Sequence, residues 1–132
     1  MSVHPQQDMR TAMRRVRHLG SARSGTSHFW HQRLTSVAGI SLTLIFVVIV
    51  LSLMGRNHAA TVQILGSPWV VILMLLFVLN TTYHMWLGMQ VIIEDYVHHE
   101  LSKFALLMTN TFFCVVTGLA CVYALLKLSF GV

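Results

Sequence analysis

WVVILMLLFVLNTTYHMWLGMQVIIEDY, residues 69–96, is the stretch on which the fold depends. It has no formally charged residue before Glu94, and about 20 apolar residues are enough to cross the hydrocarbon core of a bilayer. Backbone amides find no water there, so the span has to be a helix. Its polarity is unusual for lipid, because it also carries Asn80, Thr81, Thr82, Tyr83, His84 and Gln90.

Two further apolar runs lie on either side of this stretch. Together they predict an all-α membrane protein with three transmembrane helices, at about residues 34–54, 69–93 and 103–126. Pro68 and Trp69 suit the start of the second span, and a short helix is expected at residues 59–65. We therefore divide the chain into a basic N-terminal segment, residues 1–33, and a three-helix anchor, residues 34–132.

Charge is scarce and unevenly placed. Charged residues make up 10% of the chain, against about 25% in soluble domains, and apolar residues make up 55%. Six of the seven arginines precede the first span: Arg10, Arg14, Arg15, Arg17, Arg23 and Arg33. We interpret these arginines as a signal that orients the spans in the membrane and not as a nucleic-acid-binding arm. They place the N-terminus in the cytoplasm and, after three spans, the C-terminus in the periplasm. The first twenty residues lack the apolar core of a secretory signal, so we expect a multi-pass protein of a bacterial inner membrane.

Several chemistries have no motif in this sequence. There is no glycine-rich nucleotide-binding loop and no CxxC pair for an iron–sulfur cluster. Cys114 and Cys121 lie seven residues apart in the third span, on one helix face, where they are too far apart to form a disulfide and are expected to pack. Any electrons that pass through the protein would therefore come from another chain.

His84 is the one histidine well inside a predicted span. An ionisable side chain there is costly and is usually functional, and neutral imidazole is a common axial ligand of haem iron. A hydrogen bond to a neighbouring helix is an equally good interpretation. Gly88, one turn later, either leaves room for a flat macrocycle or lets two helices approach closely. If haem binds between two histidines, the second one has to come from a partner chain.

Asp95 and Tyr96 end the same span. Tyr96 lies roughly 18 Å of helix rise beyond His84. A tyrosine hydroxyl can donate a hydrogen bond to a quinone carbonyl, and a neighbouring carboxylate can orient it or pass protons. The alternative is an interfacial aromatic residue next to acidic residues that mark a helix end.

The remaining polar residues at this end of the helices admit two interpretations. Arg33 could pair with an anionic group such as a haem propionate, or could anchor the helix at the membrane surface. His98 and His99 lie in the short cytoplasmic loop, where they are expected to be solvated or to lie at a subunit interface, and proton uptake is the alternative interpretation. The roles of His28 and His31 stay open.

Two motifs together resemble the hydrophobic membrane-anchor family of succinate dehydrogenase (complex II), in its alphaproteobacterial form. They are GSARSGTSHFWHQRLT, residues 20–35, and YHMWLGMQVIIEDYV, residues 83–97. The family pattern has glycine four residues after a histidine, then Asp-Tyr at eleven and twelve, and His84, Gly88, Asp95 and Tyr96 match it. The resemblance covers about residues 20–130. Thr35-Ser36 departs slightly from the Thr-Gly or Thr-Ala usual in the family.

The resemblance implies a role for each of these residues. His84 would be an axial ligand of haem b, shared with a second cytochrome b anchor subunit, with Gly88 in the haem pocket. Arg33 would approach a propionate, and Tyr96 and Asp95 would bind ubiquinone. A flavoprotein subunit and an iron–sulfur subunit would deliver electrons from succinate within the respiratory chain and citric acid cycle. This chain would have no catalytic residue for succinate itself.

Other functions are possible on the same sequence. An anchor of a quinol:fumarate reductase would have a similar fold and similar partners. A di-haem cytochrome b would need several histidines inside its spans, and only His84 meets that requirement here, which disfavours this class. A transporter or a non-redox structural subunit would not need the spacing of His84, Gly88, Asp95 and Tyr96.

Overall fold

The computed structural model describes residues 24–130 of the chain, as four helices. The helix α2 spans Ser24–Leu53, α3 spans His58–Leu65, α4 spans Pro68–Tyr96 and α5 spans Glu100–Phe130. Three of them, α2, α4 and α5, are long and apolar enough to cross a membrane. The prediction of three transmembrane helices is confirmed. The arginines from Arg10 to Arg23 lie outside the described residues.

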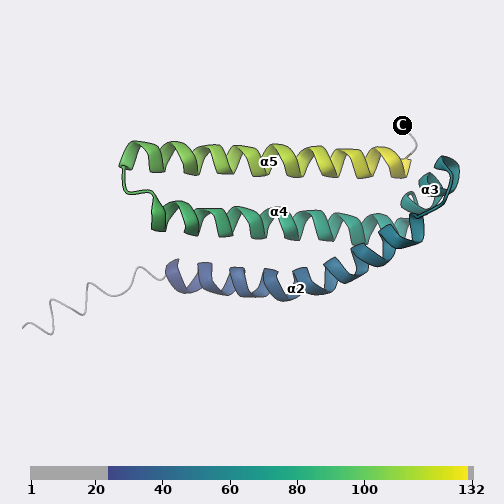
Figure 1. Ribbon diagram of the computed structural model, residues 1–132, viewed down its shortest axis with the longest axis horizontal. Helices are drawn as coiled ribbons and strands as arrows, with labels where there is room; N and C mark the ends of the chain where they lie inside the picture. The colour runs from purple at the N-terminus through teal and green to yellow at the C-terminus, as the bar shows by residue number, and fades with distance from the viewer. Residues whose placement is uncertain (1–23, 131–132) are drawn as a thin grey trace, which may run out of the picture.

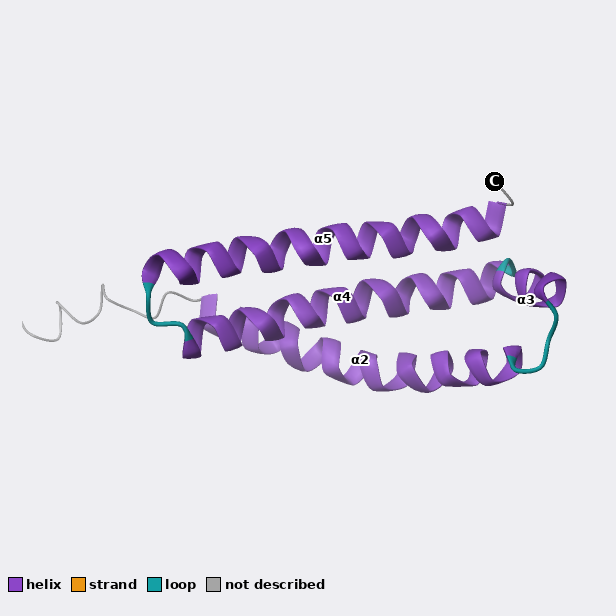
Figure 2. Ribbon diagram, turned by 45° about the horizontal axis from the view of Figure 1, so that its top comes forward, coloured by secondary structure: helices purple, strands orange, loops and turns teal. Residues whose placement is uncertain are grey.

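The helix α4 lies between the other two long helices (Figure 1). It packs against α2 on one side and α5 on the other, and α2 has no comparable packing against α5. Successive long helices run in opposite directions (Figure 1). The start of α2, the end of α4 and the start of α5 therefore meet at one end of the bundle, and α3 lies at the other end (Figures 1 and 2).

Local signals in the sequence account for three of the helix ends. The side chain of Asn57 accepts a hydrogen bond of 2.9 Å from the backbone N–H of Ala60 and caps α3. Pro68 occupies the first turn of α4, as expected. Gly55, with φ of 73°, makes the left-handed turn after α2. The helix α2 begins at Ser24, so the segment His28–Arg33 continues directly into the first span.

Very little of this fold is buried within the chain. The buried hydrophobic side chains within residues 24–130 are Ile49, Val71, Leu87, Ile93, Cys114 and Leu125. Large apolar residues along every long helix are exposed, for example Leu44 on α2 (64%) and Phe104 on α5 (66%). Lipid or other protein chains are needed to cover such a surface, because three packed helices cannot.

The side chain of Lys103 bonds across the turn between α4 and α5. Lys103 donates a hydrogen bond of 3.0 Å from Nζ to the backbone oxygen of Glu94 at the end of α4. The helix α4 ends at Tyr96, as the sequence indicated, but the loop is shorter than the predicted residues 97–102, because α5 already begins at Glu100. Cys114 and Cys121 are both free, as the spacing predicted, although Cys114 is buried and Cys121 is exposed.

Close packing between α4 and α5 depends on Gly118. A Cβ atom at this position would lie 3.2 Å from Cγ2 of Thr82, which is too close for easy accommodation. We predict that Gly118→Val separates the two helices and destabilises the fold by about 1–3 kcal/mol, since overpacking a tight contact has that cost. SDS-induced unfolding in mild detergent measures the change. The matched control is Ala120→Val at an exposed position of α5; equal stability of the two variants would contradict the assignment.

Candidate functional site

A groove of about 490 Å³ lies between α2 and α4, and His84 is part of its wall. The other lining residues are mostly small or hydroxyl-bearing: Thr35, Ser36, Gly39, Ile40, Thr43, Leu44, Asn80 and Thr81. Small side chains on both helices leave this space open. Within residues 24–130, no group of three or more histidine, cysteine or acidic side chains could hold a metal ion. His84 is the one histidine on the groove wall.

One ring nitrogen of His84 is engaged across the helix interface. Its Nδ1 lies 2.8 Å from Oγ1 of Thr35, at hydrogen-bonding distance. On the same side of α4, Asn80 donates a hydrogen bond of 3.1 Å from Nδ2 to the backbone oxygen of Thr35. The predicted bond from His84 to a neighbouring helix is therefore present. Because that bond occupies only Nδ1, it leaves Nε2 for a ligand role.

A second cross-helix contact lies beside the first. The Tyr83 hydroxyl and Nδ1 of His31 form a hydrogen bond of 3.0 Å, and the two rings meet edge to face at 6.0 Å. The rings of Tyr83 and Trp86 are 5.8 Å apart and stacked. His31, whose role the sequence left open, therefore joins the start of α2 to α4.

Gly88 lies against the side chain of Gln32. A Cβ atom on Gly88 would be 3.5 Å from Nε2 of Gln32, and Gly88 is not part of the groove wall. That separation is ordinary van der Waals contact with the end of a flexible side chain, so it does not require a glycine at this position. The Oε1 atom of Gln32 is buried and accepts no hydrogen bond within residues 24–130. Gly88 as part of a haem pocket stays a prediction.

Arg33 is exposed near the start of α2. Its guanidinium carbon lies 4.9 Å above the centre of the Phe29 ring, within range of a cation–π contact. The side chain is thus held at the surface of the bundle with its donors accessible. A carboxylate could bind to it there.

Asp95 and Tyr96 are the last two residues of α4 and both are exposed, with Tyr96 78% accessible. His98 and His99 follow and are exposed as well. The side chain of Leu101, in the first turn of α5, is 77% exposed. This end of the bundle is therefore an open surface with polar and apolar groups, and a closed pocket around Tyr96 would need additional chains.

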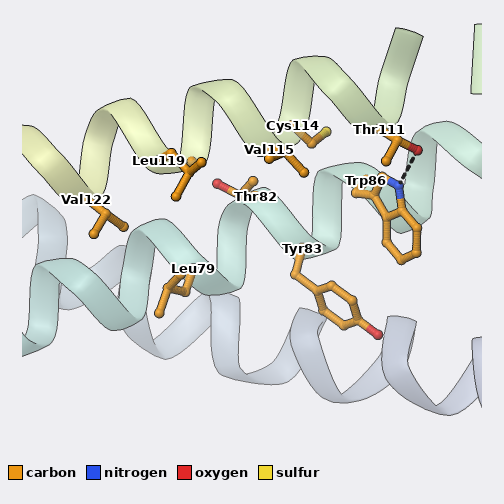
Figure 3. A pocket seen from close by; sticks show the side chains of 10 residues that line it. Leu79, Thr82, Tyr83, Trp86, Thr111, Cys114, Val115, Leu119 and Val122 are labelled. Carbon is orange, nitrogen blue, oxygen red and sulfur yellow. Dashed lines mark hydrogen bonds between the residues drawn. The ribbon is translucent and has the colours of Figure 1, made fainter. Parts of the chain in front are cut away.

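The opposite side of α4 carries a different groove, of about 430 Å³ (Figure 3). Trp86 donates a hydrogen bond of 3.1 Å from Nε1 to Oγ1 of Thr111, as Figure 3 shows. The buried Asn110 donates from Nδ2 to the backbone oxygen of Trp86 at 3.2 Å. The lining is almost wholly apolar and has no histidine. We therefore place the candidate site in the α2–α4 groove.

Two polar residues of the interfaces were not predicted from the sequence. Thr35 stood out only as part of a motif, and its contact with His84 depends on how α2 and α4 pack. Asn110 was missed, although an asparagine in the middle of an apolar span is a signal in itself, because its amide needs partners in lipid.

Comparison with known proteins identifies a family and several relatives of this chain. Residues 7–124 match the family described as succinate dehydrogenase/fumarate reductase transmembrane subunit. The chain is 34% identical to a succinate dehydrogenase hydrophobic membrane anchor subunit of Rickettsia conorii, over 89% of this chain and 94% of that protein. It is 31% identical to the subunit of the same name in Paracoccus denitrificans, over 86% and 87% of the two chains. No solved structure matches the chain.

Proposed function

The chain belongs to the succinate dehydrogenase/fumarate reductase transmembrane subunit family and is a membrane anchor subunit of succinate dehydrogenase, and from this premise we propose that it binds haem b and forms part of the ubiquinone site. It is a multi-pass protein of the bacterial inner membrane that works with the catalytic subunits of the enzyme. The observation that carries the proposal is the position of His84 on the wall of the α2–α4 groove, with Nδ1 bonded to Thr35.

The residues of the groove fit a haem group. A flat macrocycle needs space beside its axial ligand, and small residues such as Ser36 and Gly39 provide it next to His84. Haem b would supply a one-electron redox centre inside the membrane. His84 would bind through Nε2, and Arg33 would hold a propionate bidentately at the membrane surface. The second axial ligand would come from another cytochrome b anchor subunit, since His84 is the one histidine in this groove.

The quinone site would lie at the end of α4. Reduction of ubiquinone consumes two electrons and two protons, and the electrons would reach this end of the bundle from an iron–sulfur subunit fed by a flavoprotein subunit. Tyr96 would donate a hydrogen bond from its hydroxyl to a quinone carbonyl, and Asp95 would orient that hydroxyl or pass a proton. Because Tyr96 is exposed here, the rest of the pocket would come from neighbouring subunits.

The proposed function also implies an orientation of the helices in the membrane. The end of the bundle that carries Arg33, Tyr96 and Lys103 would face the cytoplasm, where the catalytic subunits meet the anchor. Phe130 would then lie towards the periplasm. Succinate dehydrogenase is favoured over an anchor of fumarate reductase, because the Rickettsia and Paracoccus relatives are both named as succinate dehydrogenase subunits.

We predict that His84→Ala removes the haem b absorbance from the purified complex, because the iron loses a protein ligand. A dithionite-reduced minus oxidised spectrum, scaled to flavin content, measures the loss; we expect less than about a tenth of the signal to remain. His58→Ala, in α3 at the far end of the bundle, is the control. A full haem signal in His84→Ala would rule out the ligand role.

We predict that Tyr96→Phe lowers quinone reduction by about tenfold, the effect of one lost hydrogen bond of ~1.4 kcal/mol. Succinate oxidation with a soluble dye should persist, because that chemistry takes place on another subunit. Tyr123→Phe, at an exposed position of α5, is the matched control. An equal fall in both activities would contradict a quinone role for Tyr96 and would indicate failed assembly.

We predict that Ser36→Phe lowers the haem content of the complex, because the larger side chain fills the groove beside His84. The hydroxyl of Ser36 donates only to the backbone oxygen of Gln32 within α2, so its loss costs little. Ser52→Phe is the control, since Ser52 makes the same kind of bond to Ile49 and lies outside the groove. Equal haem content in both variants would place the haem elsewhere.

A further inference from the structure

The hydroxyl of Thr35 lies at the centre of three short contacts. It is 2.7 Å from the backbone oxygen of His31, 3.2 Å from the backbone oxygen of Gln32 and 2.8 Å from Nδ1 of His84. The two carbonyl oxygens can only accept hydrogen bonds, whereas Nδ1 can accept or donate according to the tautomer of the ring. The arrangement of protons at Thr35 therefore determines which nitrogen of His84 is protonated.

The distances favour one arrangement. A threonine hydroxyl has a single proton, and two oxygens 2.7 Å apart need a proton between them, since lone pairs would otherwise face each other. Thr35 thus donates to the oxygen of His31, as threonines in helices commonly do one turn back. Its oxygen then accepts from His84, so Nδ1 carries the ring proton. Nε2 is left with a free lone pair, the form of imidazole that binds a metal.

We propose that Thr35 is a positioning residue for the haem ligand: it fixes the tautomer and the ring orientation of His84 and raises the basicity of Nε2. This inference rests on the proposed role of His84. A ligating histidine normally donates its other N–H to an acceptor that serves these purposes. Here the acceptor is a hydroxyl on the neighbouring helix, and it is polarised by the carbonyl to which it donates.

The position of Thr35 is itself fixed from α4. Asn80, one turn before His84, donates to the backbone oxygen of Thr35 at 3.1 Å. Gly39, one turn further along α2, permits this approach, because a Cβ atom there would lie 3.3 Å from Nδ2 of Asn80. The two helices are therefore held in the register that brings the Thr35 hydroxyl to His84.

The test compares Thr35→Val, which keeps the side-chain shape and removes the hydroxyl, with Thr35→Ser, which keeps the hydroxyl. Haem content per flavin and the reduction potential of haem b are measured on the intact complex. In Thr35→Val we expect haem affinity to fall about 10- to 100-fold, or the potential of retained haem to rise, since a less basic ligand stabilises ferric iron less. Thr35→Ser should keep the haem affinity and the reduction potential of the unmodified protein.

Ser52→Ala is the matched control, because the hydroxyl of Ser52 also donates within α2, to the backbone oxygen of Ile49, and Ser52 lies outside the groove. Normal haem content and potential in Thr35→Val, or an equal change in Ser52→Ala, would overturn the inference. His84→Ala separates this failure from that of the proposed function. If His84→Ala loses haem while Thr35→Val has normal haem, only the proposed role of Thr35 is wrong. If His84→Ala keeps a normal haem content, His84 is not the ligand, and the inference about Thr35 is wrong as well.

Discussion

The absence of hydrogen-bonding partners in the hydrocarbon core determines how this bundle is arranged. Polar groups in a span have to be bonded inside the protein, and α4 carries a cluster of them around His84. Asn80, Tyr83 and His84 bond to α2, while Trp86 bonds to α5. The middle position of α4 follows from this requirement, because a helix with polar groups around much of its circumference needs a neighbour on both sides.

The same requirement connects packing with function. The bond between Thr35 and His84 holds α2 against α4, and it engages only one of the two ring nitrogens. A single histidine can thus serve both as a packing contact and as a metal ligand, so the two interpretations of His84 are compatible. The extensive exposed apolar surface of the three helices fits a subunit whose remaining contacts are made by lipid and by other chains.

The sequence was sufficient to predict the three spans and the short helix α3, because the length of an apolar run and its lack of charged residues are local properties. It did not locate the start of α2, since the polar residues after Ser24 mark the edge of the membrane and not the end of a helix. The sequence also did not predict which side chains contact one another across the helix interfaces. Which residue of α2 faces His84 depends on the crossing and register of two helices, and Gly88 illustrates this, because only packing shows that it faces Gln32.

The central claim is that this anchor subunit contributes to a haem site within a succinate dehydrogenase. The most direct measurement is a dithionite-reduced minus oxidised optical spectrum of the complex that co-purifies with this chain in mild detergent. The account predicts a b-type haem signal together with flavin and iron–sulfur subunits. Those subunits without any haem would contradict the claim, leaving His84 as a packing residue between α2 and α4.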